Sequence, residues 1–85
     1  MKVKVLYFAF LRDAMGRTSD EVEAPDSVAT VGALREHLTS LGDPWARAFA
    51  SVKRIRASVN QQMASDSDPV KDGDEVAFFP PVTGG

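Results

Sequence analysis

A short alternating stretch near the start of the chain reads Lys2-Val3-Lys4-Val5-Leu6-Tyr7-Phe8-Ala9. Val3, Val5 and Tyr7 fall on one side and the two lysines on the other, which is the pattern of a strand with one buried face. The same alternation points Phe8 toward solvent. A strand of this kind needs neighbouring strands and a covering layer on its apolar side only.

The next segment is expected to pair with this strand. Arg12–Arg17 contains Gly16 and is expected to form a turn, after which Thr18–Glu23 forms the second strand of a hairpin. Pro25-Asp26 ends that strand.

Two later segments also alternate between polar and apolar residues. One covers residues 54–59 and ends at Asn60-Gln61, followed by a short return through Met63. The other covers residues 75–79, with Val76 and Phe78 on one face, so that Phe79 falls on the polar side. The segments between them are expected to be a loop, Ser65–Pro69, and a tight turn, residues 71–74.

The covering layer is expected from helices in the middle of the chain. Apolar residues recur at helical spacing between Thr30, a suitable N-cap, and Gly42, which suits a left-handed C-cap; they are Val31, Leu34, Leu38 and Leu41. A short second helix is expected after Asp43-Pro44, with Trp45 and Phe49 forming an apolar stripe that covers the core. Together the pattern predicts an α+β fold: a mixed sheet over one main helix plus a short second helix.

The composition of the chain argues against several classes of function. The chain has 85 residues, of which 44% are hydrophobic and 26% charged, with a net charge of -2. These values are typical of a single globular domain, and no apolar run is long enough for a membrane span or a secretory signal. We expect a cytoplasmic protein that binds neither membranes nor nucleic acid, since no basic field would gather phosphates.

Side chains that could carry chemistry do not form a recognisable site. The chain has no cysteine, so neither a thiolate metal site nor a thiol nucleophile is available. His37 stands alone, the acidic residues from Asp66 to Glu75 do not fit a calcium loop, and no serine lies in a nucleophile elbow. Nucleotide-binding glycine motifs are also absent from the sequence, so we expect no metal, and any ATP step must belong to a partner.

The C-terminus is the most distinctive part of the sequence. Residues 80–85 read Pro-Pro-Val-Thr-Gly-Gly. The two prolines favour an extended tail, reaching roughly 20 Å over six residues. The two glycines leave no side chain beside the terminal carboxylate, so the chain can enter a narrow channel of another protein. That carboxylate resists nucleophiles until it is activated, most simply as an acyl-adenylate. We therefore predict a domain over residues 1–79 with a functional, extended tail over residues 80–85 that is mobile after Pro81.

An apolar patch is expected beside the root of this tail. Phe8 and Phe79 both point outward by strand parity, and Met63 is expected to join them. Exposed apolar side chains of this kind favour a protein-docking surface. The alternative is that sheet twist or a second helix buries them.

The C-terminal residues and two earlier segments of the chain resemble those of a known family. Residues 71–85 closely resemble the C-terminus of the small, sulfur-carrying subunits of molybdopterin synthase, a ubiquitin-like family of the MoaD and ThiS type. Val59-Asn60-Gln61 and residues 5–9 match earlier segments of that family, so the likeness covers nearly the whole chain. The resemblance implies a β-grasp fold and a sulfur-carrier function in molybdenum cofactor biosynthesis.

The resemblance also implies roles for individual residues. An activating enzyme related to those of ubiquitin would use ATP to adenylate Gly85, which becomes a thiocarboxylate and donates sulfur to cyclic pyranopterin monophosphate in the large subunit. The tail residues Gly84, Thr83, Val82, Pro81 and Pro80 would bind in the partner's channel, and Phe8, Met63 and Phe79 match the docking positions. No cofactor would be bound intrinsically, the complex would be a heterotetramer, and catalytic side chains would lie on the large subunit. Tyr7 places a hydroxyl on the core side and needs a partner if buried.

Three other functions remain open from the residues alone. Gly-Gly tails also serve sulfur carriers for thiazole, tRNA thiolation or cysteine synthesis. A ubiquitin-like modifier would instead join Gly85 to target lysines. A plain interaction module would have an inert tail.

Overall fold

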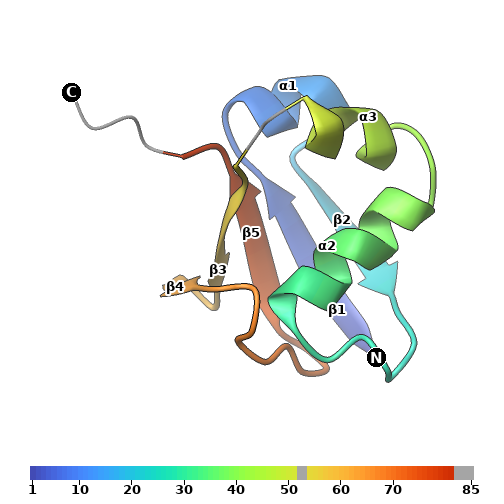
Figure 1. Cartoon of the computed structure of the whole chain (residues 1–85), viewed down its shortest axis with the longest axis vertical. Helices are drawn as coiled ribbons and strands as arrows, with labels where there is room; N and C mark the ends of the chain where they lie inside the picture. The colour runs from blue at the N-terminus through green and yellow to red at the C-terminus, as the bar shows by residue number, and fades with distance from the viewer. Residues whose placement is uncertain (52–53, 82–85) are drawn as a thin grey trace.

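Five strands form one mixed sheet in the order β2-β1-β5-β3-β4 (Figure 1). The computed structural model describes residues 1–51 and 54–81. β1 (Lys2–Tyr7) is antiparallel to β2 (Ser19–Glu23) and parallel to β5 (Glu75–Phe79). β3 (Arg56–Val59) is antiparallel to β5 and to β4 (Gln62–Ala64). The predicted mixed sheet and α+β class are confirmed.

One face of the sheet carries the core. Val3, Val5 and Tyr7 are each at most 1% exposed, and Val76 and Phe78 on the neighbouring strand are fully buried. The alternation of residues 2–8 therefore gives the correct face for each side chain, whereas Ala9, on the core side by alternation, is exposed because β1 has ended and α1 follows. The helices lie on this face, and the other face has no helix over it among the described residues (Figure 1).

The main helix is α2 (Val31–Ser40), as the periodicity predicts. The Thr30 side chain caps it by accepting a hydrogen bond from the Ala33 N–H at 3.2 Å. Gly42 follows the helix with φ +91°, the left-handed conformation expected of it. The apolar residues of α2 that are buried are Val31, Leu34 and Leu38.

The second predicted helix is α3 (Trp45–Ala50), which closes the core at one end. It begins just after Pro44 rather than at it, and the Asp43 carboxylate accepts a hydrogen bond from the Arg47 N–H at 3.2 Å. The Phe49 ring meets the Phe78 ring edge-on with 5.4 Å between centroids. This contact ties α3 to the central strand β5.

A third helix corrects the sequence analysis. The segment expected to be a turn is α1 (Phe10–Met15), so β1 and β2 pair as predicted but are not joined by a simple hairpin turn. Leu11 and Met15, four residues apart, are 0% and 5% exposed because they face the core beside α3. Gly16 ends the helix with φ +73°. The helical layer thus has three members instead of two.

The parallel pairing of β1 and β5 determines where the tail begins. Because β1 and β5 run in the same direction, both end at the same edge of the sheet, where α1 begins and Pro80 leaves β5 (Figure 1). Pro80 and Pro81 are partly exposed and belong to no strand. The predicted tail residues Val82, Thr83, Gly84 and Gly85 lie outside the described residues, so the division at residue 79 and the mobility of the tail stay predictions. No described helix has the length and apolar character needed to cross a membrane.

Candidate functional site: the open sheet face beside the tail

The open face carries side chains that alternate with the core positions. In β5, Phe78 faces the helices, so its neighbour Phe79 faces the other way. Phe79 pairs across the sheet with Arg56, and Ser58 pairs with both Ala77 and Met63. Residues paired in register lie on one face, so Phe79 and Met63 flank β3 on the open side.

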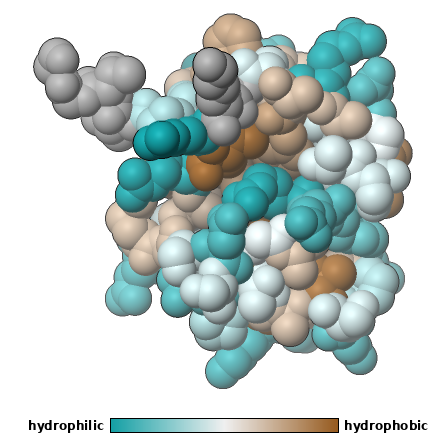
Figure 2. All heavy atoms as spheres, viewed as in Figure 1, coloured by the Kyte–Doolittle hydropathy of each residue, from teal (hydrophilic) through white to brown (hydrophobic). Residues whose placement is uncertain are grey.

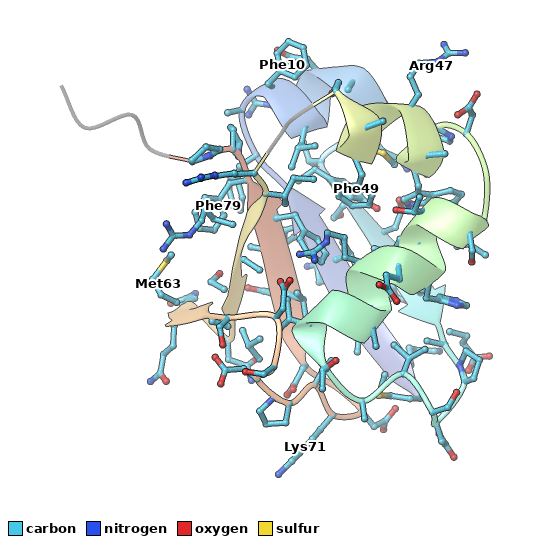
Figure 3. The ribbon with its side chains drawn as sticks, in the orientation of Figure 1. Phe10, Arg47, Phe49, Met63, Lys71 and Phe79 are labelled. Carbon is cyan, nitrogen blue, oxygen red and sulfur yellow. The ribbon has the colours of Figure 1, made fainter. Side chains whose placement is uncertain are left out.

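The predicted apolar patch is exposed there. The side chain of Met63 is 60% exposed and that of Phe8 46%, whereas Phe79 is half-buried. Figure 3 shows Met63 and Phe79 on the same side of the molecule, below the point where the chain leaves the sheet. Phe8 follows β1 and donates its backbone N–H to the Phe78 carbonyl at 3.1 Å, which places it beside Phe79. The structure therefore brings Phe8, Met63 and Phe79 to one face at the root of the tail.

Beneath the patch, Tyr7 has the hydrogen-bond partners that its buried hydroxyl requires. The hydroxyl donates to the Asp20 carboxylate and accepts from the Trp45 Nε1–H, each at 2.9 Å. Burial, partly offset by the hydrogen bond from Trp45, raises the pKa of Tyr7 well above its ordinary value. Arg17 completes the network, with its Nε 2.8 Å from Asp20 and its guanidinium 5.2 Å from the Trp45 ring centre. This network fixes α3 against the ends of β1 and β2.

The other candidate residues do not assemble into a reactive site. His37 is a partly exposed residue in the last turn of α2. Asp66 forms two hydrogen bonds of 2.7 Å with Arg35, and this pairing lowers the pKa of the Asp66 carboxyl and raises that of Arg35. Within residues 1–51 and 54–81, no three metal-ligating side chains gather to hold an ion.

The structure also shows features that the sequence analysis did not single out. Phe10, the first residue of α1, is 56% exposed at the tail end of the molecule (Figure 3). Its exposure depends on α1, which was expected to be a turn. Leu11 and Met15 are spaced four residues apart, as on one face of a helix, but two apolar positions are too few to predict a six-residue helix.

Comparison with known proteins agrees with this geometry. The ThiS family matches residues 5–85. The molybdopterin synthase sulfur carrier subunit of Escherichia coli (strain K12) is 49% identical over 83 residues, which cover 98% of this chain and 99% of that protein. The corresponding subunit of Haemophilus influenzae is 46% identical with the same coverage. Among solved structures, SAMP1 from Haloferax volcanii has a TM-score of 0.76 and 28% identity over the full length of both chains.

These likenesses confirm the fold that the resemblance implies. The element order and the sheet topology are those of the ubiquitin-like β-grasp fold. The family match includes residue 85, the last residue of the sequence. The chain belongs to the ThiS family and is one of its molybdopterin synthase sulfur carrier subunits.

Proposed function

We propose that Gly85 carries sulfur as a thiocarboxylate and delivers it to a pterin held by the large subunit of molybdopterin synthase. The observation that carries the proposal is the continuity of β5 with the tail. A central strand, paired on both sides, leads at Phe79 straight into Pro80, Pro81 and the Gly-Gly end. The paired strand therefore leads directly into the tail, whose last two residues have no side chain.

The reaction begins with a carboxylate that is a poor electrophile. An activating enzyme joins the Gly85 carboxylate to the AMP part of ATP, and pyrophosphate leaves. Hydrosulfide then attacks the acyl carbon and displaces AMP, so that sulfur replaces one oxygen of the carboxylate and the product is a thiocarboxylate. In the large subunit the thiocarboxylate sulfur bonds to a carbon of cyclic pyranopterin monophosphate and displaces an oxygen from it; water then hydrolyses the acyl–sulfur bond, which leaves the sulfur on the pterin and restores the Gly85 carboxylate, so the chain is recycled.

The chain's own residues contribute binding and reach. Phe8, Met63 and Phe79 are proposed to dock on the partner, because desolvating exposed apolar side chains favours association. Pro80 and Pro81 stiffen the start of the tail, and Val82, Thr83 and Gly84 are proposed to follow it into the partner's channel. We propose the same surface for the activating enzyme, since both partners need the same carboxylate.

The proposal assigns no resident cofactor to this chain. ATP is bound by the activating enzyme, and the thiocarboxylate is the one covalent modification proposed. The proposed assembly with the large subunit is a heterotetramer in the cytoplasm, where ATP is available to the activating enzyme.

Intact-mass spectrometry tests this proposal directly. The full chain is incubated with the activating enzyme, ATP and a sulfur source, and we expect a mass increase equal to replacing one oxygen by sulfur. A chain lacking Gly85 serves as the control, with an unchanged melting temperature and no sulfur transfer to the pterin in the large subunit. An unmodified full-length chain beside a demonstrably active enzyme, or pterin conversion supported by the truncated chain, would contradict the proposal.

A second function is favoured by one observation. A Haloferax volcanii neighbour with 27% identity and a TM-score of 0.76 is described as small archaeal modifier protein 1. A modifier would join Gly85 to lysines, so lysates containing a tagged chain would show a ladder of heavier conjugates that disappears without Gly85. Absence of any ladder would exclude this role, and reconstitution with thiazole, tRNA or cysteine-forming acceptors would separate the remaining sulfur carriers.

A further inference from the structure

The charges of the molecule are separated between its two ends. Arginines lie at the end where the tail begins, on α1, on α3 and at the start of β3. The opposite end carries most of the carboxylates, only partly offset by lysines; they are Glu21, Glu23, Asp26, Asp68, Asp72, Asp74 and Glu75. A chain of net charge -2 thus presents a basic end around its tail. Such a dipole orients an approaching partner.

Two of these arginines, Arg54 and Arg56, lie just before and in β3, whereas Arg12, which also has no ion pair among the described residues, lies on α1. Arg17 is paired with Asp20 and Arg47 with Asp43, at 2.8 and 3.3 Å. Arg54 and Arg56 are exposed and make no ion pair with another residue of the part of the chain that the structure describes. Arg56 lies opposite Phe79 in the sheet, and Arg54 comes two residues earlier. Both therefore lie next to the strand that leads into the tail.

A cavity of about 560 Å³ adjoins Arg54 on the helical side of the sheet. Its apolar lining comes from α3 and from the residue before β3: Ala46, Phe49, Ala50 and Ile55. Figure 2 shows hydrophobic atoms at the bottom of a hollow on this face, with hydrophilic side chains around it. The volume lies in the range of sites that bind a small ligand or a partner's side chain.

The charged side chains around this cavity favour an acidic group of a partner on the side of Arg54. Asp66 also lines it, but its charge is matched by the bidentate pair with Arg35. Glu36, on α2, is a carboxylate of the lining that has no ion pair among the described residues, whereas Arg54 lies two residues before β3 on another side of the cavity. The cation without a described partner is thus on the side nearest the tail.

We propose that the large subunit docks an acidic segment across Arg54 and Arg56 and inserts an apolar side chain of that segment into the cavity. This docking site rests on the proposed function, because it requires the partner that takes the tail. The cavity lies on the helical face of the sheet, whereas Arg56 lies on the open face beside Phe79, so the docked segment would pass around the start of β3 and adjoin the patch of Phe8, Met63 and Phe79. The carboxylates steer and orient the complex, and the apolar side chain slows its dissociation.

Binding kinetics with the purified large subunit test the charged part of the site. In the full-length chain, Arg54→Glu and Arg56→Glu should each lower the association rate about tenfold at low salt, and added salt should shrink the difference. Lys71→Glu, an equal charge change at the opposite end of the molecule (Figure 3), should change the rate by less than about twofold. Circular dichroism confirms that each variant is folded.

A second pair of variants tests the cavity. Ala50, exposed on α3, lines it, so Ala50→Trp should fill it and raise the dissociation rate about tenfold without changing the salt dependence. Ala29→Trp, at an exposed loop position before α2, should have no effect. An Ala50→Trp chain that dissociates like the wild type would overturn the apolar anchor.

The controls separate this inference from the proposed function. A wild-type chain that does not bind the large subunit would overturn both. Normal wild-type binding, with Arg54→Glu and Arg56→Glu behaving like Lys71→Glu, would overturn the docking site alone. Self-association of the wild-type chain that Ala50→Trp abolishes would assign the cavity to a second copy and also overturn the proposal.

Discussion

Phe78 and Phe79 are adjacent in β5 but belong to different regions of the molecule. Phe78 is fully buried under the helices and packs against Phe49, whereas Phe79 lies half-buried on the open face beside Arg56. The period of a strand, two residues, assigns one to the core and the other to the surface. One strand therefore serves both folding and, in the proposed function, docking.

The two faces of the sheet differ in what completes them. On the covered face, α1, α2 and α3 exclude water from the apolar side chains, and the Tyr7 hydroxyl is paired. On the open face, Phe8 and Met63 stay exposed in the free chain. Helices of the same chain shield the covered face from water, whereas the open face is suited to binding another protein. Substitutions on the two faces should therefore affect different measurements.

The largest expected effect comes from replacing each of the two phenylalanines in turn. Phe78→Ala removes a fully buried ring and should lower the free energy of unfolding by about 3 to 5 kcal/mol. Phe79→Ala should cost less than about 1.5 kcal/mol, because its ring is only partly removed from water. Urea denaturation followed by circular dichroism measures both values.

Binding to the large subunit should instead depend mainly on Phe79, the residue whose substitution costs less stability. A Phe79→Ala chain that is folded should bind more weakly than the wild type by about tenfold or more. Equal losses of stability for the two variants, or unchanged binding by Phe79→Ala, would show that the strand does not divide its roles in this way.

A smaller effect is expected from the polar network beneath the patch. Tyr7→Phe leaves the Trp45 indole N–H without its acceptor and should lower the free energy of unfolding by about 1 to 2 kcal/mol. Trp45 is the single tryptophan of the chain, so its fluorescence reports the change in its surroundings and the unfolding transition. A fully stable Tyr7→Phe chain would show that this hydrogen bond is replaced by water.

The same tyrosine predicts a pH dependence. Its pKa is raised in the folded chain, so above about pH 10 the unfolded chain releases the phenolic proton while the folded chain retains it. The free energy of unfolding should therefore be constant with respect to this group below pH 10 and fall as the pH rises further. Tyr7→Phe should show a shallower alkaline loss than the wild type, measured by urea denaturation at several pH values.

The sequence predicts the elements whose pattern is local. The alternation of residues 2–8 and the spacing of Val31, Leu34 and Leu38 give β1 and the main helix with their buried faces. The outward positions of Phe8 and Phe79 follow from strand parity. A repeated period over six or more residues is enough to assign a face without tertiary information.

Features that depend on packing between distant segments could not be predicted in this way. α1 is too short to have a clear period and is stabilised where Leu11 and Met15 meet the core. The cavity beside Arg54 needs α2, α3 and the start of β3 to be placed together. The Tyr7 hydroxyl could be expected to need a partner, but Trp45, which lies 38 residues away, could not be named.

The smallest expected effect concerns the turn between β3 and β4, at the edge of the open face. Asn60 and Gln61 have φ of +49° and +70°, so both central residues of this two-residue turn are left-handed. Asparagine tolerates this conformation, whereas glutamine is strained by its Cβ. Gln61→Gly should therefore raise the free energy of unfolding by about 0.5 to 1 kcal/mol.

The adjacent position provides the control for this turn. Gln62→Gly, within β4, should lower the free energy of unfolding by a similar amount, because glycine in a strand loses more entropy on folding. Neither change should alter binding of the large subunit, since Met63 keeps its pairing with Ser58. If Gln61→Gly instead weakened binding while stabilising the fold, the strained turn would belong to the docking surface, and the division between the two faces would extend to their edge.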